Sequence, residues 1–212
     1  MTSVPESLPA AGRSFDAAGS PDLVAAPIGE PHASIGGPSV PTLAEIAERI
    51  LALPDVTQVR ADAQSGAPEA SWGDRFFFAG PNRRLPFATI VEHDTPGFDE
   101  DSHLDRPGIF RLNVHVGREE FQRRFGYPPA ELPDHRSGID FTRCDEVLPH
   151  PAYGTYGWAC VLNPGIRRLP EVDQLLSHAR GRAAGEHRRA REPADAAARA
   201  VLESSTTRAD PA

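Results

Sequence analysis

Three groups of polar residues have the types and spacing that ligand recognition or catalysis requires. In the first, Arg111, Asn113 and His115 alternate with apolar residues. Alternate positions of a strand share one face, so these side chains would lie side by side. Arg offers a bidentate fork to carboxylate or phosphate, and His can act as a general base near neutral pH. The pattern fits a site for a small anion or the ordinary solvent face of an antiparallel sheet.

The opposite face of this predicted strand is fully apolar. It carries Phe110, Leu112, Val114 and Val116. We therefore expect Arg111 and His115 to lie outside the core. Replacing either by Ala should then cost no more than about 0.5 kcal/mol, as at ordinary surface positions.

The second group is the run HPAYGTYGW, which begins at His150. His150, Tyr153 and the aromatic residues after them could form the wall of a ligand pocket, with glycines permitting close backbone approach. The structural alternative is that Trp158 begins a buried strand and His150 shapes the turn before it. His150 and Tyr153 are therefore candidate ligand-binding residues together with Arg111, Asn113 and His115.

The third group is the acidic loop between Glu92 and Asp105, which also contains imidazoles. His93, Asp94 and His103 are the candidate metal ligands, since imidazole and carboxylate both bind divalent transition metals. The loop lacks the H-x-x-x-H or C-x-x-C spacing that brings ligands together on a rigid element. We therefore expect a solvated loop and predict no metal and no cofactor.

Several common chemistries lack their sequence signals. Cys144 and Cys160 are the two cysteines, and Cys160 lies in an apolar run typical of an inert buried thiol. There is no G-x-S-x-G elbow, no P-loop and no Rossmann glycine pattern. These absences argue against the common hydrolase and nucleotide-binding classes.

The elements that would position these residues can be predicted from periodicity. Thr42 and Glu45 form a capping box, and apolar residues with helical spacing follow to Leu51. A closing amphipathic helix is expected from Glu171 to Arg182, with Val172, Leu175, Leu176 and Ala179 buried. Between these helices we expect a short helix after Gly117, ended by Gly126, and five strands: 56–60, 75–79, 85–92, 109–116 and 158–162. The pattern predicts one α+β domain, a mostly antiparallel sheet packed by an N-terminal and a C-terminal helix.

Both ends of the chain differ in composition from the middle. Residues 1–40 are rich in Pro, Ala and Gly without apolar periodicity, which predicts a disordered tail. Residues 183–212 offer only scattered apolar anchors, which predicts a disordered or weakly helical tail. The α+β domain should therefore occupy residues 41–182.

Composition narrows the class of protein. All 22 basic residues are Arg and the net charge is −8, which argues against a nucleic-acid-binding domain. The first residues lack the pattern of a signal peptide, and no run reaches the roughly 18 apolar residues that span a bilayer. We therefore expect a soluble, cytoplasmic protein, a monomer or small homo-oligomer, with no membrane partner. The Arg-only composition indicates a GC-rich, actinobacterial source.

Three extended runs carry a resemblance. The runs GDRFFFAGPNRRLPFATIVEHD, LDRPGIFRLNVHVGREEFQRRFG and LPHPAYGTYGWACVLNP together resemble an uncharacterised family of actinobacterial domain-of-unknown-function proteins, over about residues 42–182. The last run is also remotely similar to the ends of YjbR-like and luciferase-associated small α+β domains. The resemblance implies a fold class and brings no activity, substrate or catalytic residues.

The leading hypothesis is a non-catalytic binding or interaction module. It would present the polar sheet face of Arg111, Asn113 and His115 to a small anionic ligand or a protein partner. The alternative is a small enzyme that uses His115 with Arg111, assisted by His93 or a metal. A nucleic-acid-binding domain is the third hypothesis. The first two differ in whether these side chains converge around one concavity.

Overall fold

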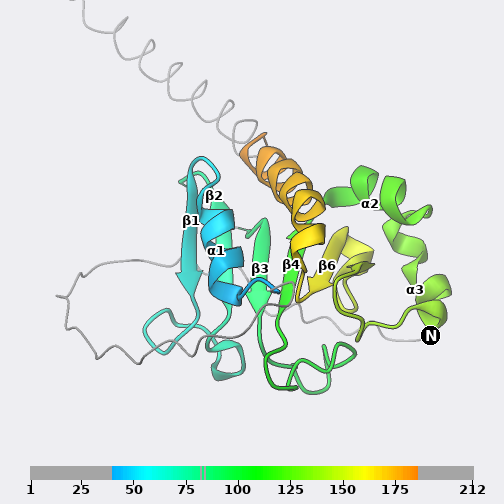
Figure 1. Cartoon of the computed structure of the whole chain (residues 1–212), viewed down its shortest axis with the longest axis horizontal. Coiled ribbons are helices and arrows are strands. Elements are labelled where there is room, and N and C mark those ends of the chain that lie inside the picture. The colour runs from blue at the N-terminus through cyan, green and yellow to red at the C-terminus, as the bar shows by residue number, and fades with distance from the viewer. Residues whose placement is uncertain (1–39, 82, 84, 186–212) are drawn as a thin grey trace, which may run out of the picture.

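The computed structural model describes residues 40–81, 83 and 85–185 of the chain. These residues form a six-stranded sheet in the order β1-β2-β3-β4-β6-β5, and every neighbouring pair is antiparallel (Figure 1). The predicted α+β class is confirmed. The strands are β1 (Val56–Arg60), β2 (Arg75–Ala79), β3 (Ala88–Val91), β4 (Arg111–His115), β5 (Val147–Pro149) and β6 (Trp158–Leu162).

Helix α1 (Leu43–Leu51) begins at the predicted capping box. Glu45 donates its backbone N–H to Thr42 Oγ1 at 3.2 Å, and Thr42 donates its backbone N–H to the Glu45 carboxylate at 2.7 Å. Ile46 and Ile50, four residues apart, are fully buried against the sheet. The apolar spacing and the cap thus determine where this helix starts and which face it buries.

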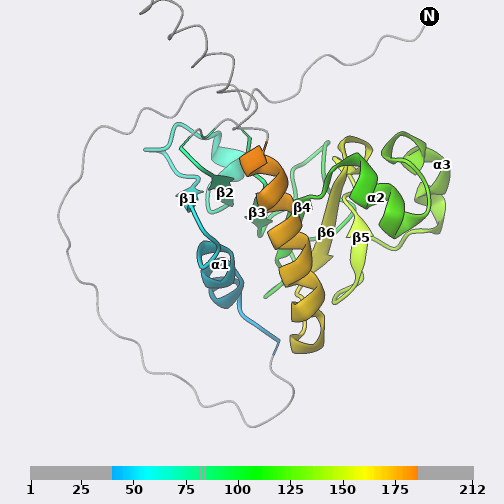
Figure 2. The same cartoon turned by 90° about the horizontal axis from the view of Figure 1, so that it is seen from above.

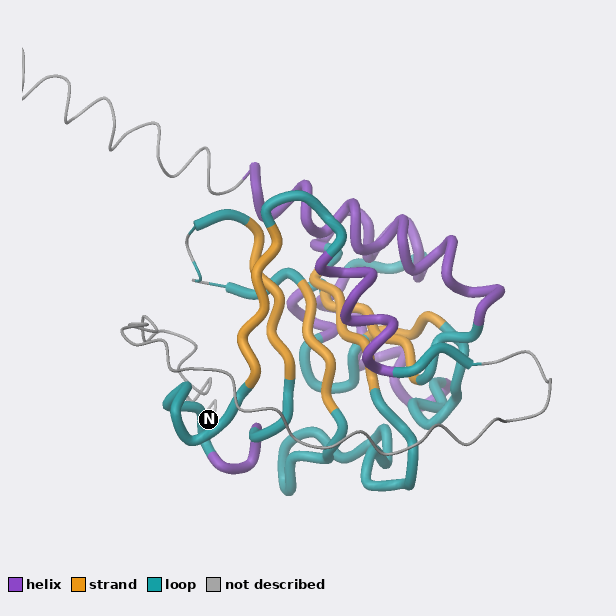
Figure 3. Tube along the Cα trace, turned by 60° about the vertical axis from the view of Figure 1, so that its left-hand side comes forward, coloured by secondary structure: helices purple, strands orange, loops and turns teal. Residues whose placement is uncertain are grey.

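One face of the sheet is covered by two helices. Figures 2 and 3 show α1 and the closing helix on the same side of the strands. The closing helix, expected over 171–182, occupies residues 169–185 and buries the four predicted residues Val172, Leu175, Leu176 and Ala179. They pack with Leu112 and Val114 of β4 in the main core. Packing of these two helices accounts for the fully apolar side of β4.

Helix α2 (Gly117–Phe125) follows β4 directly and ends at Gly126, which has the predicted left-handed conformation with φ of 84°. The rings of Phe121 and Phe125 lie 4.6 Å apart, as their i, i+4 spacing predicts. The helix begins where Gly117 donates its backbone N–H to Gly157 at 2.9 Å. A side chain on Gly157 would meet the backbone of Gly117 at 2.9 Å, so this close approach requires glycine.

The sequence missed two elements between α2 and β6. They are α3 (Leu132–His135) and the three-residue edge strand β5. Neither has enough residues to show a period, and both contain Pro, which weakens a helix or strand pattern. Pro149 is tolerated because an edge strand leaves one side of its backbone unpaired. Single 3₁₀ turns occupy Glu69–Ser71, Pro129–Glu131, Arg136–Gly138, Gly154–Tyr156 and Ile166–Arg168.

Some predicted boundaries were too long. β3 spans 88–91 instead of 85–92, and β4 spans 111–115 instead of 109–116. Pro86 has no backbone N–H to offer a ladder, which agrees with the later start of β3. The predicted tails fall mostly outside the described residues, in 1–39 and 186–212. No helix in the described part of the chain is long and apolar enough to cross a membrane.

Candidate functional site

The polar side of β4 is buried at Arg111 and Asn113. Arg111 is 1% exposed and Asn113 is 3% exposed. The Arg111 guanidinium donates to Asn113 Oδ1 at 2.8 Å, to Ser102 Oγ at 2.7 Å and to both carboxylate oxygens of Asp99 at 3.1 and 2.5 Å. The expectation that Arg111 lies outside the core is wrong, because the connection 92–110 brings Asp99 and Ser102 onto this face.

The buried polar side chains of the described region gather around Arg111, most of them joined by hydrogen bonds. Asn113 donates to Thr89 Oγ1 at 2.9 Å, and Arg111 Nη2 lies 3.3 Å from His150 Nε2. Such a network offsets the desolvation of its members only when each finds partners. Since Asp99 neutralises Arg111, the guanidinium does not offer an open fork to an external anion. The members, here called the buried network, are Thr89, Asp99, Ser102, Arg111, Asn113 and His150.

His150 is held as a neutral imidazole within this network. Its Nδ1 accepts the backbone N–H groups of Ala152 and Tyr153, both at 3.1 Å, so the neutral ring carries its proton on Nε2 and Arg111 Nη2 packs beside that atom without a hydrogen bond. Burial, and then the Arg111 charge, hold the pKa of His150 well below its ordinary value. His150 therefore positions the turn that follows it, and its occupied Nδ1 is a poor general base.

A partly exposed aromatic rim lies at the edge of the buried network. His115 stacks on Trp158 with ring centroids 5.1 Å apart and 16° between the planes. His115 Nε2 lies 3.2 Å from the Tyr156 carbonyl oxygen, and its Nδ1 lies 3.4 Å from Arg182 Nη2. Burial, followed by the Asp99 charge, raises the pKa of Tyr153. The first and second groups of polar residues predicted from sequence therefore meet on one face of the sheet. Their charged and acid–base side chains, Arg111, His115 and His150, already contact other parts of the protein.

Of the candidate metal ligands, His93 and Asp94 contact different partners, and His103 is exposed. His93 Nδ1 lies 3.9 Å from Asp105 Oδ1, while Asp94 Oδ1 accepts the Leu104 backbone N–H at 2.9 Å. Within the described ranges, no three His, Cys, Asp or Glu side chains gather as a metal-ligand set. Asp94 instead stabilises the fold of the 92–110 connection.

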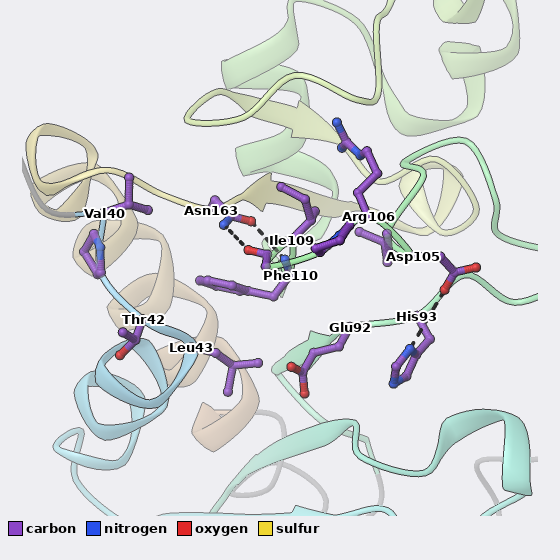
Figure 4. A pocket seen from close by; sticks show the side chains of 14 residues that line it. Val40, Thr42, Leu43, Glu92, His93, Asp105, Arg106, Ile109, Phe110 and Asn163 are labelled. Atoms are coloured by element: carbon purple, nitrogen blue, oxygen red, sulfur yellow. Dashed lines mark hydrogen bonds and ion pairs between the residues drawn. The ribbon is translucent and has the colours of Figure 1, made fainter. Parts of the chain in front are cut away.

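A hollow of about 610 Å³ lies at the end of β3 and β4, and the sequence did not predict it. Its size falls within the range typical of small-molecule sites. Figure 4 shows Glu92, His93 and Asp105 on one side and Leu43 and Phe110 facing them. The lining comes from four stretches of chain: 40–43, 92–93, 104–110 and residue 163. Because these stretches are far apart in sequence, no local motif marks the hollow.

Asn163 holds the chain that borders this hollow. Its Oδ1 accepts the Phe110 backbone N–H at 2.9 Å, and its Nδ2 donates to the Gly108 carbonyl at 2.8 Å (Figure 4). Asn163 has a φ of 38°, a conformation that Asn tolerates better than most residues. The hollow is therefore bordered by hydrogen-bonded backbone, not by a loose loop.

Asp74 is a second feature that the sequence did not single out. It immediately precedes β2, and its carboxylate accepts the backbone N–H of Glu92. Burial raises the pKa of Asp74 to about 7, and repulsion from Glu92 and Asp99 adds to this while Arg111 opposes it. Asp74 therefore changes charge near neutral pH beside a residue that lines the hollow.

Asp74→Asn is expected to stabilise the domain more at pH 8 than at pH 4. The folded-state pKa of Asp74 lies above its unfolded value, so its contribution to stability is full below about pH 4 and is lost as the pH rises to about 7. Asn cannot ionise and retains the acceptor oxygen. The difference should reach about 1–2 kcal/mol, since solvent still reaches this group. Urea unfolding at several pH values measures it, and a pH-independent difference would contradict it.

Thiol chemistry has no support at Cys160. This side chain is 1% exposed, and burial raises its pKa to about 12. Cys144 is exposed and also a free thiol. The predicted inert, buried state of Cys160 agrees with the structure.

These features define an α+β domain with a buried polar network on one sheet face and a hollow at the sheet end. A family model, "Family of unknown function (DUF6194)", matches residues 41–192, and the chain belongs to this family. The predicted membership of an uncharacterised family is thus confirmed, while no finding supports an actinobacterial source or YjbR-like similarity. Neither the curated proteins nor the solved structures contain a match.

Proposed function

We propose that the domain is a non-catalytic module that binds a small molecule in the hollow between α1 and the 92–110 connection. The observation that carries this proposal is the 610 Å³ hollow, where apolar and ionisable side chains from four separate stretches face one another. Its border is held by the Asn163 hydrogen bonds, so the site is largely preformed. A preformed site avoids part of the ordering cost of binding.

We do not propose the polar face of β4 as the contact surface. Arg111 is buried and pairs with Asp99, so the argument for a small anion there loses its basis. The enzyme hypothesis loses support for the same reason, because a substrate would need Arg111 and His115 around one concavity. An actinobacterial source, a cytoplasmic location and a monomer or small homo-oligomer remain predictions from sequence.

The experiment is an NMR titration of the full chain with a panel of small amines, carboxylic acids, sugars and nucleosides. We expect at least one class to shift the amides of Glu92, Phe110 and Asn163 together. Val40 lines the hollow and is 53% exposed, so Val40→Trp should fill part of the hollow and weaken binding at least tenfold.

The matched control for that variant is Ile166→Trp. Ile166 is 50% exposed and does not line the hollow, so its replacement should leave binding unchanged. A panel without any binder, or a ligand whose affinity is the same with Val40→Trp, would overturn the proposed function.

A further inference from the structure

We infer that the ligand of the hollow is an organic cation, a protonated amine or quaternary ammonium that carries an apolar substituent. This inference rests on the proposed function and adds the chemical class of the ligand. It depends on which charged groups face the hollow, which are turned away from it, and what forms its other wall.

The carboxylates that line the hollow are Glu92 and Asp105. They come from the two ends of the 92–110 connection and lie on the same side of the hollow as His93 (Figure 4). His93 Nδ1 is 3.9 Å from Asp105 Oδ1, so two carboxylates and one imidazole share this wall. The ionisable groups at this wall therefore favour a positively charged ligand over a negatively charged one.

Arg106 also belongs to the lining, but its guanidinium is used elsewhere. Its Nε donates to the His103 carbonyl at 2.7 Å, and its Nη2 donates to the carbonyls of Ser102 and Thr142 at 3.1 and 3.3 Å. In Figure 4 its side chain extends away from Glu92 and His93. Among the described residues that line the hollow, no guanidinium is thus directed toward an anionic ligand.

The start of α1 reaches the same hollow through Thr42 and Leu43. A helix N-terminus can attract anions through its unpaired N–H groups. Here the Glu45 carboxylate accepts the Thr42 backbone N–H, and Thr42 Oγ1 accepts that of Glu45. The capping box therefore engages the N–H groups of Thr42 and Glu45 and places one more negative charge near this end of the helix.

The side facing the carboxylates is largely apolar. Leu43 and Phe110 lie there (Figure 4), and Ile109 also belongs to the lining. A strongly hydrated inorganic cation would gain little from such a wall, whereas an alkyl or aryl ammonium buries its substituent there. Within the described region, moreover, no three potential ligand side chains form a metal-binding group. Both observations favour an organic cation over a metal ion.

The test uses three probes of nearly equal size and different charge: benzylammonium, benzyl alcohol and benzoate. Each is titrated into the full chain at pH 7.5 and followed by the amide shifts of Glu92, Phe110 and Asn163. We expect benzylammonium to bind at least tenfold more tightly than benzyl alcohol, and benzoate to leave these amides unchanged. Higher salt should weaken benzylammonium binding.

Two variants and a control test whether the preference for benzylammonium depends on Glu92 and Asp105. Glu92→Gln and Asp105→Asn should each weaken benzylammonium binding about three- to tenfold, with little effect on benzyl alcohol. Glu119→Gln removes an exposed carboxylate from α2, outside the hollow lining, and should change neither. Thermal melts of all three variants confirm that they remain folded.

The outcomes separate the inference from the proposed function. If benzyl alcohol or benzoate occupies the hollow as tightly as benzylammonium, the cation class is wrong while the binding module stands. Equal binding by wild type and Glu92→Gln would also reject the assigned charge recognition. If no member of this series or of the wider panel shifts these amides, both proposals fail together.

Discussion

Arg111→Met should destabilise the domain by about 3–5 kcal/mol, the largest effect that we expect from a single polar residue. Met fills a similar volume but leaves the buried Asp99 carboxylate without its cationic partner. Asn113 and Ser102 each lose a hydrogen bond as well. Urea unfolding at pH 7 measures the loss, and a cost below 1 kcal/mol would show that the buried network contributes little.

The control for this variant is an exposed ion pair of the same type. Arg49 and Asp173 join α1 to the closing helix at 2.8 Å, with side chains 41% and 43% exposed. Arg49→Met should therefore cost only about 0–1 kcal/mol. The double variant Arg111→Met, Asp99→Leu should regain part of the loss, because removing both charges leaves neither buried alone. These comparisons separate loss of a buried pair from loss of any Arg.

Leu112→Ala should cost about 2–5 kcal/mol. Leu112 is fully buried between the sheet and its two covering helices, so truncation removes apolar contacts and leaves a cavity. The effect should appear as a lower urea midpoint with an unchanged m-value. A cost below 1 kcal/mol would mean that the core collapses around the shorter side chain.

His115→Ala, on the opposite side of the same strand, is the comparison for Leu112→Ala. His115 is partly exposed, stacks on Trp158 and contacts Arg182. We therefore expect a cost of about 0.5–1.5 kcal/mol, above that of an ordinary surface position and below that of Leu112. The two sides of β4 thus differ in kind: one is packed by helices, and the other carries a hydrogen-bonded network that ends in a partly open rim.

If the hollow binds an organic cation, the buried network has a positioning role. Asp99 and Ser102 attach the middle of the 92–110 connection to Arg111, while both ends of that connection line the hollow. Substitutions in the network would then change ligand affinity through the shape of the hollow. This coupling depends on the proposed binding activity and is measured by repeating the benzylammonium titration with Arg111→Met, at a temperature where the variant stays folded.

Local patterns were sufficient to predict the elements whose residues interact within a few positions. The capping box of Thr42 and Glu45 determined the start of α1, and the left-handed Gly126 determined the end of α2. Alternation in β4 correctly separated Leu112 and Val114 from Arg111 and Asn113. Each of these predictions depends on a period or a cap that residues within about one turn or one strand establish by themselves.

The burial of Arg111 depended on contacts that no such pattern contains. Alternation shows that one side of β4 is polar, but not that Asp99, 12 residues earlier, and His150, 39 residues later, close over it. From sequence alone, the acidic loop is equally compatible with solvent exposure. Only the fold shows that its Asp99 pairs with the buried Arg111. The hollow has the same origin, because the ends of four distant stretches border it. Burial and charge pairing depend on which segments the fold brings together. For this protein, the local sequence determined on which face of a strand each polar residue lies. Only tertiary packing determined whether that residue is buried and which charge it meets.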